Sequence, residues 1–369
     1  MRPSLIQNLL LIAMLAASAG VARAQLTGRV VDSAGGAPLE DVHVFLANSA
    51  YGGITGPEGA FTLADIPPGA YQLVVSILGF VPETRTITIE AGVPQEVSIR
   101  LSKAIYTVGE VSVTAERGRR RTRDLERFYA LFLGQTPNRN GCEILNPEVI
   151  DIEDADGTFT VSAVAPLTIE NRALGYRLTY VLREFSARVN EHRYLGEPFF
   201  EDLTPNNDRE ERRWEKNRRE TYFGSMAHFL RAAAGGTAEA EGFRTFLFDR
   251  PSWLMTYLDF RKATREERAE VDVDSLILPG RASYERVLRL PAYLHVVYLN
   301  ETMHAAFYQG RKLYTGMPEP QLSVLEPLLD YVPFNEQGFL QESFSVARYG
   351  YWSWKSSVCD MLPLGWKPL

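Results

Sequence analysis

A set of polar side chains in the second half of the chain could bind an acidic or sugar ligand. Arg218, Tyr222 and His228 fall on a stretch with helical character, and Tyr176 opens a segment that alternates like a strand. Residues four apart on a helix share one face, so Arg218 and Tyr222 point the same way. If this helix lies over the strand, the side chains form a polar pocket. The alternative is a buried hydrogen-bond network that fixes the helix on the sheet.

Hydrolytic chemistry has a weaker signal in the same helix. Ser225 and His228 are three residues apart and share a face, as a nucleophile and its base would. No orienting acid accompanies them, and the Gly-x-Ser-x-Gly sequence of a nucleophile elbow is absent. The alternative for this pair is a close-packed Gly-Ser position within a helix.

The five histidines do not form a metal-binding pattern. None begins His-x-x-Glu or His-Glu-x-x-His, so the zinc carboxypeptidase and zincin patterns are missing. His295 and His304 could converge on a metal across a turn, and two structural histidines are the alternative. The acidic residues from Asp151 to Asp156 lack the spacing of a calcium loop, and glycine-rich phosphate loops are absent. The sequence therefore predicts no metal and no cofactor.

The two cysteines, Cys142 and Cys359, are candidates for a disulfide. In an oxidising compartment this bond would tie the start of the second domain to its end. Two buried free thiols are the alternative, because the sequence does not give the distance between the two Cα atoms.

Residues 1–24 have the three zones of a secretory signal peptide. A basic start precedes an apolar run at Leu9–Ala17, and Ala22-Arg23-Ala24 is a small-x-small cleavage site. A membrane anchor is the alternative, but the run is shorter than the ~20 residues that a span needs. No later segment is apolar enough to cross a bilayer. We therefore expect cleavage after Ala24 and a periplasmic or secreted protein without a transmembrane segment.

Residues 25–103 have the pattern of one small β-sandwich. Turns rich in glycine and proline recur along this stretch, and apolar residues alternate between them. Seven short strands of this kind predict two packed sheets. The predicted strands are Leu26–Asp32, Val42–Leu46, Gly53–Thr55, Ala60–Leu63, Tyr71–Ile77, Thr84–Ile89 and Gln95–Leu101.

The same stretch resembles the carboxypeptidase-regulatory-like (transthyretin-like) domain. Two segments carry the resemblance, GRVVDSAGGAPLEDVHVFL and GGITGPEGAFTLADIPPGAYQLVVSILGF. The matching positions are Gly28, Asp32, Pro38, Leu39, Val42, Val44, Thr55, Gly59, Phe61, Pro68, Gly69, Tyr71, Gly79 and Phe80. In its families the domain is an accessory module that precedes zinc carboxypeptidase domains, outer-membrane receptors and envelope proteins of Bacteroidetes-like bacteria. The resemblance implies a fold, and fold analogy alone assigns no ligand.

Residues 104–127 form a predicted connector. Val108–Ala115 resembles the segment that follows this domain in TonB-dependent receptors, where such a strand can pair with an energy-transducing partner. A linker or an edge strand is the alternative. Leu125, Phe128 and Phe132 have the spacing of a short amphipathic helix.

The connector also carries a basic run. It could meet lipid phosphates or an acidic protein, and a solvated stretch that opens a helix is the alternative. The arginines of the run are Arg117, Arg119, Arg120, Arg121, Arg123 and Arg127.

The pattern of residues 128–369 predicts an α+β domain. We expect a charged helix at Asn207–Ala234, a second helix at Ala238–Phe246, and a short helix or turn near Ser323–Asp330. The expected strands are Glu148–Ile152, Thr158–Ala163, Leu167–Glu170, Tyr176–Phe185, Arg188–Tyr194, Trp253–Phe260, Ser275–Leu278, Arg286–Leu290, Ala292–Leu299 and Gly310–Tyr314. Segments such as FLGQTPNRNGCEILNP and RWEKNRRETYFGSMAHFLRA resemble the main body of uncharacterised exported proteins of Bacteroidetes-like bacteria that carry the regulatory-like domain in front.

The sequence as a whole predicts a mainly β protein with an α+β second domain. A formal charge of −7 over 369 residues argues against nucleic-acid binding. We expect a non-enzymatic binding or interaction protein of the cell envelope, whose partner is a protein or a glycan. The alternative is a hydrolase with its site in the C-terminal domain.

Overall fold

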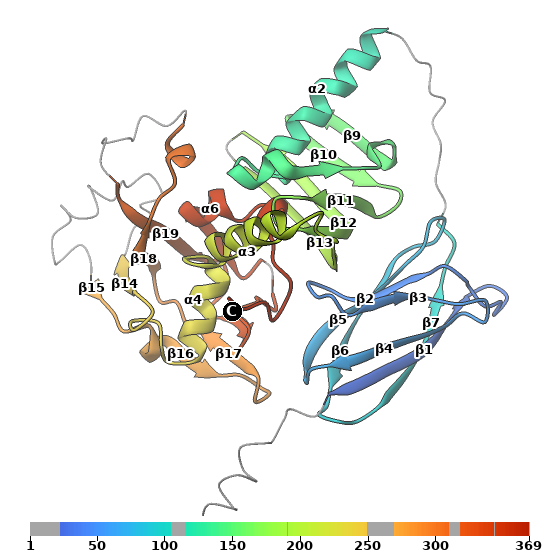
Figure 1. Cartoon of the computed structure of the whole chain (residues 1–369), viewed down its shortest axis with the longest axis horizontal. Coiled ribbons are helices and arrows are strands. Elements are labelled where there is room, and N and C mark those ends of the chain that lie inside the picture. The colour runs from blue at the N-terminus through green and yellow to red at the C-terminus, as the bar shows by residue number, and fades with distance from the viewer. Residues whose placement is uncertain are drawn as a thin grey trace, which may run out of the picture. The chain divides into compact units, whose positions relative to one another are not determined.

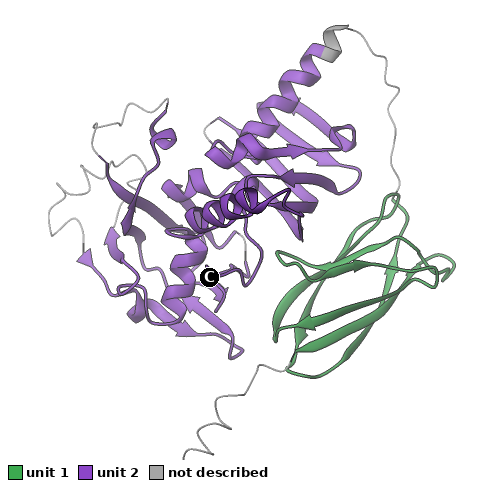
Figure 2. Cartoon of the chain, viewed as in Figure 1, with its two compact units in different colours: residues 1–107 green, residues 108–369 purple. Residues whose placement is uncertain are grey.

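The computed structural model describes residues 23–104, 115–189, 191–248, 269–309, 318–342 and 344–368 (Figure 1). The chain divides into two compact units, residues 1–107 and residues 108–369 (Figure 2). Among the described residues, no helix has the length and apolar character needed to cross a membrane. The predicted signal segment before residue 23 lies outside these ranges, as do residues 108–114 and the predicted strands at 253–260 and 310–314.

The first unit is a seven-stranded β-sandwich, as the sequence predicts. One sheet has the order β4-β1-β7 and the other has the order β3-β2-β5-β6. The strands are β1 (Ala24–Asp32), β2 (His43–Leu46), β3 (Gly52–Ile54), β4 (Ala60–Ile66), β5 (Gly69–Ser76), β6 (Glu83–Ile89) and β7 (Gln95–Leu101).

Alternation along these strands explains the sandwich. Residues two apart point to the same face of a strand, so the alternating apolar residues of β1, β5 and β7 fill the space between the sheets. Leu26, Val30 and Leu73 are fully buried. Gly28 is required where β1 meets its neighbours, because a Cβ atom there would lie 2.3 Å from the carbonyl oxygen of Val97.

The first described helix of the second unit covers a six-stranded sheet. The sheet has the order β8-β11-β12-β10-β9, and β13 pairs along the other edge of β12. The elements are α2 (Ala115–Phe132), η1 (Pro137–Gly141), β8 (Cys142–Ile144), η2 (Pro147–Val149), β9 (Ile150–Ala155), β10 (Thr158–Ala163), β11 (Leu167–Asn171), β12 (Tyr176–Arg188) and β13 (Glu191–Asp202).

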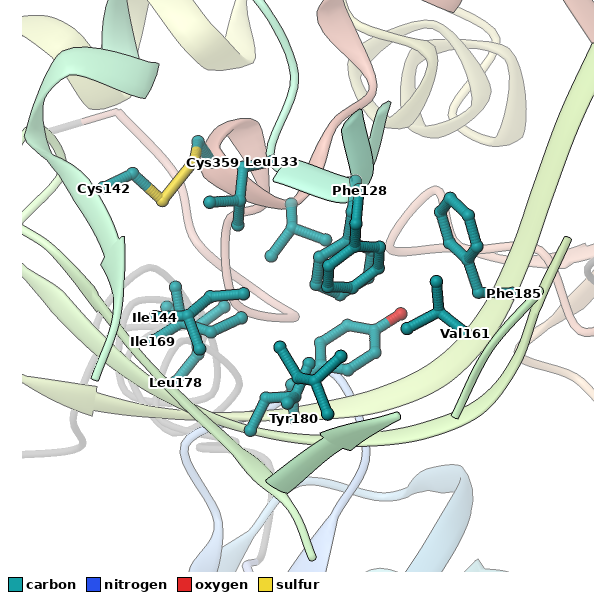
Figure 3. Close-up of a cluster of buried hydrophobic side chains, with 14 of the residues drawn as sticks. Phe128, Leu133, Cys142, Ile144, Val161, Ile169, Leu178, Tyr180, Phe185 and Cys359 are labelled. Atoms are coloured by element: carbon teal, nitrogen blue, oxygen red, sulfur yellow. A yellow bond between two sulfur atoms is a disulfide. The ribbon is translucent and has the colours of Figure 1, made fainter. Parts of the chain in front are cut away.

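Aromatic packing holds α2 on this sheet (Figure 3). Phe128 and Phe132 are fully buried, as their helical spacing predicts. The ring of Phe132 meets Tyr180 edge-on at 5.1 Å between centroids, and Phe128 meets Phe185 edge-on at 5.0 Å. Each such ring pair stabilises the fold by about 0.5–1.5 kcal/mol beyond the contribution of the area that it buries. The predicted connector 104–127 therefore includes the first turns of a helix that belongs to the second unit.

The rest of the unit builds two further sheets around helix α4. The five-stranded sheet has the order β15-β14-β18-β19-β21, and the three-stranded sheet has the order β16-β17-β20. The helices are α3 (Asp208–Tyr222), α4 (Met226–Ala234), η3 (Val273–Leu276), η4 (Ala305–Tyr308), α6 (Tyr351–Lys355) and η5 (Val358–Asp360). The strands are β14 (Phe243–Phe248), β15 (Ala269–Glu270), β16 (Ile277–Pro279), β17 (Glu285–Leu288), β18 (Tyr293–Thr302), β19 (Pro320–Pro327), β20 (Val332–Asn335) and β21 (Val346–Gly350).

Three helix predictions in this region are wrong. The helix expected at Asn207–Ala234 is two helices, because Gly224 has φ +68° and Ser225 starts a new helix. The helix expected at Ala238–Phe246 is a turn followed by β14, and the short helix or turn expected near Ser323–Asp330 is the second half of β19 and the residues after it. Both segments pair with β18, so tertiary pairing decides their structure.

Candidate functional site

Helix α3 has one exposed face and one face directed toward the protein, and the residues on each face follow the same helical spacing. One face carries Arg209, Arg212, Arg213 and Lys216, which are all exposed. The other face carries Trp214, Asn217, Arg218 and Thr221, which point toward the protein. Both sets follow the i, i+3, i+4, i+7 pattern that defines one side of a helix.

The inward face binds the turn that joins β11 to β12. Trp214 Nε1 donates to the carbonyl oxygen of Arg172 at 2.7 Å, and Asn217 Nδ2 donates to that of Ala173 at 2.8 Å. The Nε of Arg218 donates to the Leu174 carbonyl oxygen at 2.7 Å. The helix is therefore fixed on the sheet by three side chains that bond to successive carbonyls of one turn.

Gly175 completes this junction. It has φ +74°, and a Cβ atom there would lie 2.3 Å from the ring of Trp214. Only glycine adopts such a φ readily and leaves room for the ring. Close contact between the helix and the turn therefore depends on this one position.

Arg218 and Tyr176 are brought together, as the predicted pocket requires. The guanidinium carbon of Arg218 lies 4.0 Å from the centroid of the Tyr176 ring, and Nη2 donates to Asp202 Oδ1 at 3.1 Å. Burial raises the pKa of Tyr176 above its ordinary value, with Arg218 opposing the shift. Because Arg218 also bonds to the Leu174 carbonyl, its contacts are those of a network that holds α3 on the sheet.

Tyr222 and His228 form a second pair at the junction of α3 and α4. Their ring centroids are 4.8 Å apart, and the Tyr222 hydroxyl accepts a hydrogen bond from Arg231 Nη1 at 3.2 Å. The rings of Phe243 and Tyr298 also pack on His228, at 4.9 and 5.6 Å. This pair belongs to an aromatic cluster around a buried imidazole.

Both ring nitrogens of His228 are engaged. Nδ1 accepts from the Gly224 backbone N–H at 3.1 Å, and Nε2 lies 2.7 Å from Glu241 Oε2. Since Nδ1 accepts, Nε2 carries the proton and donates to the carboxylate. Burial lowers the pKa of His228, and Glu241 partly opposes this shift. The imidazole is therefore a neutral structural group.

Ser225 does not lie beside this imidazole as a nucleophile would. Its hydroxyl accepts from the backbone N–H of His228 at 3.1 Å and so caps the first turn of α4. The predicted Ser-His face is wrong because the helix is interrupted at Gly224. The pair does not have the geometry of general-base catalysis.

The segment between α3 and α4 is held by side chains from α6. Lys355 Nζ donates to the carbonyl oxygen of Phe223, and Trp352 Nε1 donates to that of Gly224, both at 2.6 Å. Burial lowers the pKa of Lys355 to about 8, and the nearby Glu301 acts in the opposite direction.

A further polar cluster surrounds Asp360. Thr136 Oγ1 donates to its Oδ1 at 2.7 Å, Asn138 Nδ2 donates to the same oxygen at 2.8 Å, and Ser357 Oγ bonds the other oxygen. Burial raises the pKa of Asp360 to about 6, although these hydrogen bonds act in the opposite direction. The sequence did not predict this cluster. It could have been found from the cysteines, because the polar residues lie close to Cys142 or Cys359 in the sequence.

The two cysteines form a disulfide beside the Asp360 cluster (Figure 3). The Cα atoms of Cys142 and Cys359 are 6.0 Å apart, and both residues are buried in the core under α2. The bond joins β8 to η5 and so links the two ends of the second unit.

The histidines considered for metal binding have structural positions. His295 is fully buried and stacks on Phe248 at 4.1 Å, and burial lowers its pKa to about 4. His304 Nδ1 accepts from the Ala306 backbone N–H and caps η4. Among the residues that the structure describes, no group of three His, Cys, Asp or Glu side chains could hold a metal ion.

A groove runs along the outward face of α3. Its volume is about 620 Å³, and it is lined by Asn206, Asn207, Arg209, Glu210, Arg212, Arg213 and Lys216. Asn206 donates to Glu210 through its backbone N–H and its side chain, and these bonds lower the pKa of Glu210. We call this hollow the α3 groove. Sequence reasoning missed it, although the four cationic residues at helical spacing were visible.

The comparisons with known proteins identify the first unit. Residues 25–102 match the family model of the carboxypeptidase regulatory-like domain. The chain is thus a mainly β protein with this domain in front of mixed α+β sheets. No curated protein matches the chain.

Solved structures give only distant similarities. A crystal structure of a protein of unknown function from Bacteroides fragilis NCTC 9343 is 11% identical over 89% of this chain and 96% of its own, with a TM-score of 0.19. A DUF3823 family protein from Parabacteroides merdae ATCC 43184 is 13% identical over 51% of this chain and 85% of its own, also with a TM-score of 0.19.

A 3-chlorocatechol 1,2-dioxygenase from Rhodococcus opacus 1CP is 16% identical, with a TM-score of 0.19. The match covers 23% of this chain and only 61% of the dioxygenase. Similarities at this level carry no activity from these proteins to this chain.

Proposed function

We propose that this protein is a non-enzymatic binding protein of the cell envelope that holds an acidic group of a glycan or protein ligand in the α3 groove. The observation that carries the proposal is the row of four cations, Arg209, Arg212, Arg213 and Lys216, along one face of a helix. Arginine side chains bind carboxylate and sulfate groups through paired N–H donors.

The charges of the groove are only partly compensated. Arg213 pairs with Glu210 at 3.0 Å and Lys216 with Glu220 at 3.6 Å. Arg209 and Arg212 make no ion pair with the residues that the structure describes. The residues that line the groove include four cations and one carboxylate, Glu210, which leaves the groove with a net positive charge.

The helix that carries the groove is already ordered. Trp214, Asn217 and Arg218 hold its inner face on the turn between β11 and β12. A ligand on the outer face therefore does not have to order the backbone, which lowers the entropic cost of binding.

We also propose that the protein is periplasmic or secreted. The pattern of residues 1–24, with cleavage after Ala24, supports export. The disulfide between Cys142 and Cys359 gives separate support, because such bonds persist in oxidising compartments. In this proposal residues 25–103 form the front domain, and the second unit, which includes helix α2 from Ala115, is the domain that binds the ligand.

Titration calorimetry of the purified chain tests the binding proposal, with polygalacturonate as an acidic glycan and polyglutamate as an acidic peptide. We expect one of the two polymers to bind, and the double variant Arg209→Glu/Arg212→Glu to lose at least tenfold in affinity. The matched control is Arg29→Glu/Arg100→Glu in the first unit, which makes the same change in charge at exposed residues and should bind normally. Equal loss in both variants, or no binding of either polymer, would overturn the proposal.

The same samples distinguish binding from hydrolysis. We expect the bound polymer to be recovered at its original length, because His228 has neither ring nitrogen available as a base. Shortening of the polymer by the unmodified chain would instead support the hydrolase alternative.

A further inference from the structure

Helix α2 carries arginines with two different tasks. Arg121 Nη2 donates to the carbonyl oxygens of Pro147 and Ile150, both at 3.1 Å. Arg127 Nη1 bonds to Asp154 Oδ2 at 3.2 Å. These two side chains bind the helix to the sheet beneath it.

The other described arginines of α2 are Arg119, Arg120 and Arg123, and all three are exposed. At the helical rotation of each residue they fall within about 100° of arc, which Arg127 shares further along the helix. The Arg120 and Arg123 side chains are 61% and 74% exposed. We call this set the α2 arginine surface.

Two acids lie next to the α2 arginine surface, Asp124 and the exposed Glu126, which is one turn from Arg123, so three arginines face two carboxylates. Asp124 is 3.6 Å from Arg120 and 3.9 Å from Arg123, so a single carboxylate serves both guanidinium groups. An exposed ion pair of this kind contributes little and is screened by salt. The surface therefore keeps a net positive charge, although the chain as a whole has a formal charge of −7.

The chemistry of the surface favours phosphate over a protein partner. Every cation in this run is arginine, whose planar fork matches two phosphate oxygens. The exposed side chains between residues 119 and 127 are arginine, threonine and glutamate. Protein interfaces depend on buried aromatic or aliphatic anchors, and these exposed side chains supply none. Binding to a layer of lipid phosphates requires only the positive charges of the side chains.

We propose that the α2 arginine surface docks on an anionic membrane, with its guanidinium groups bound to lipid phosphates. The start of α2 extends past the strands of the sheet below it (Figure 1). The three arginine side chains are exposed there. This contact is independent of the α3 groove, because the two sets of cations lie on different helices. It would hold the second unit at a membrane while the groove engages its ligand.

Vesicle sedimentation tests this docking with the full chain. We expect the chain to sediment with vesicles that contain one part phosphatidylglycerol to two parts phosphatidylcholine, and much less with phosphatidylcholine alone. Each arginine near an anionic surface strengthens binding about fivefold, so Arg119→Gln/Arg120→Gln/Arg123→Gln should weaken it roughly a hundredfold. Glutamine keeps the helix propensity of arginine, and circular dichroism checks that the helix content is unchanged.

Three comparisons decide the outcome. The matched control is Arg29→Gln/Arg100→Gln/Lys103→Gln in the first unit, which removes the same charge from exposed residues and should sediment like the unmodified chain. All variants share the apolar run at Leu9–Ala17, so sedimentation with pure phosphatidylcholine vesicles measures what that run contributes. Equal sedimentation of the α2 variant and the unmodified chain would overturn the proposal. Loss of sedimentation in the first-unit control would also overturn it, as would crosslinking of Arg119 neighbours to an acidic protein without vesicle binding.

Discussion

Replacement of Arg218 by alanine separates the two interpretations of the predicted polar site. If the residue binds a ligand, stability should hold and binding should fall. If it fixes α3 on the sheet, the second unit should lose stability, because the carbonyl of Leu174 loses its donor and the ring of Tyr176 loses its cation.

The structure sets the size of the loss. The bond from Nε to Leu174 is short at 2.7 Å, and a hydrogen bond with a charged group contributes about 1.5–3 kcal/mol. The cation over the Tyr176 ring adds about 0.5–1 kcal/mol. Asp202 is 71% exposed, so its ion pair with Arg218 adds about 0–1 kcal/mol. We expect a total loss of about 3 kcal/mol in the free energy of unfolding.

Denaturant unfolding followed by tryptophan fluorescence measures this loss in the second unit. All five tryptophans lie after residue 107, so the signal reports the second unit alone. The matched control is Arg213→Ala, which removes an exposed arginine from the same helix and should change stability by less than about 0.5 kcal/mol. A loss for Arg218→Ala as small as that of the control would refute the structural reasoning.

Three further predictions concern the second unit. Gly175→Ala should lower its stability by more than about 2 kcal/mol, because the strain of φ +74° adds to the clash with Trp214. The control is Gly157→Ala, which has φ +72° and no atom within 4 Å of the added Cβ, and it should cost only the strain of about 1 kcal/mol. Cys142→Ala/Cys359→Ala should cost up to about 5 kcal/mol on the loop-entropy account, since 217 positions separate the cysteines, and an unchanged midpoint in denaturant would contradict it. The pKa of Asp360 is raised to about 6, so its contribution to stability is complete below its ordinary value and disappears as the pH rises to about 6. Unfolding curves at pH 4, 5, 6 and 7 should show this decline relative to Asp360→Asn, and parallel pH profiles would argue against it.

The sandwich could be predicted because its signals are local. Alternation in segments such as Gln95–Leu101 and the turns between strands specify one buried face, and the observed strands differ from the expected ones mainly at their ends. The spacing of Phe128 and Phe132 likewise predicted which side of α2 is buried.

The errors in the second unit come from contacts between distant segments. Periodicity continues through Gly224, so the sequence predicts one helix. The break is held by Trp352 and Lys355, which bond to the carbonyls of Gly224 and Phe223 from far along the chain. In the same way, β14 has residues that suit a helix or a strand, and its pairing with β18 decides between them.

For the predicted polar site around Arg218 and Tyr176, the sequence indicated which residues to consider but not how they are arranged. The sequence suggested that Arg218 and Tyr176 would meet if the helix lies over the strand, and in the structure the guanidinium carbon lies 4.0 Å from the ring centroid. It could not show that Arg218 would bond to the Leu174 carbonyl, because this bond joins two segments 44 residues apart in the sequence. The α3 groove was missed because exposed cations at helical spacing usually form a solvated face.

The disulfide also governs how the chain is made. Cys142 leaves the ribosome with 217 positions still to follow before its partner exists, so its thiol must stay reduced throughout that interval. The chain has only two cysteines, so a single molecule has no incorrect pairing to correct. An incorrect disulfide between protein thiols therefore has to join one molecule to another, and its frequency should rise with the concentration of newly made chains.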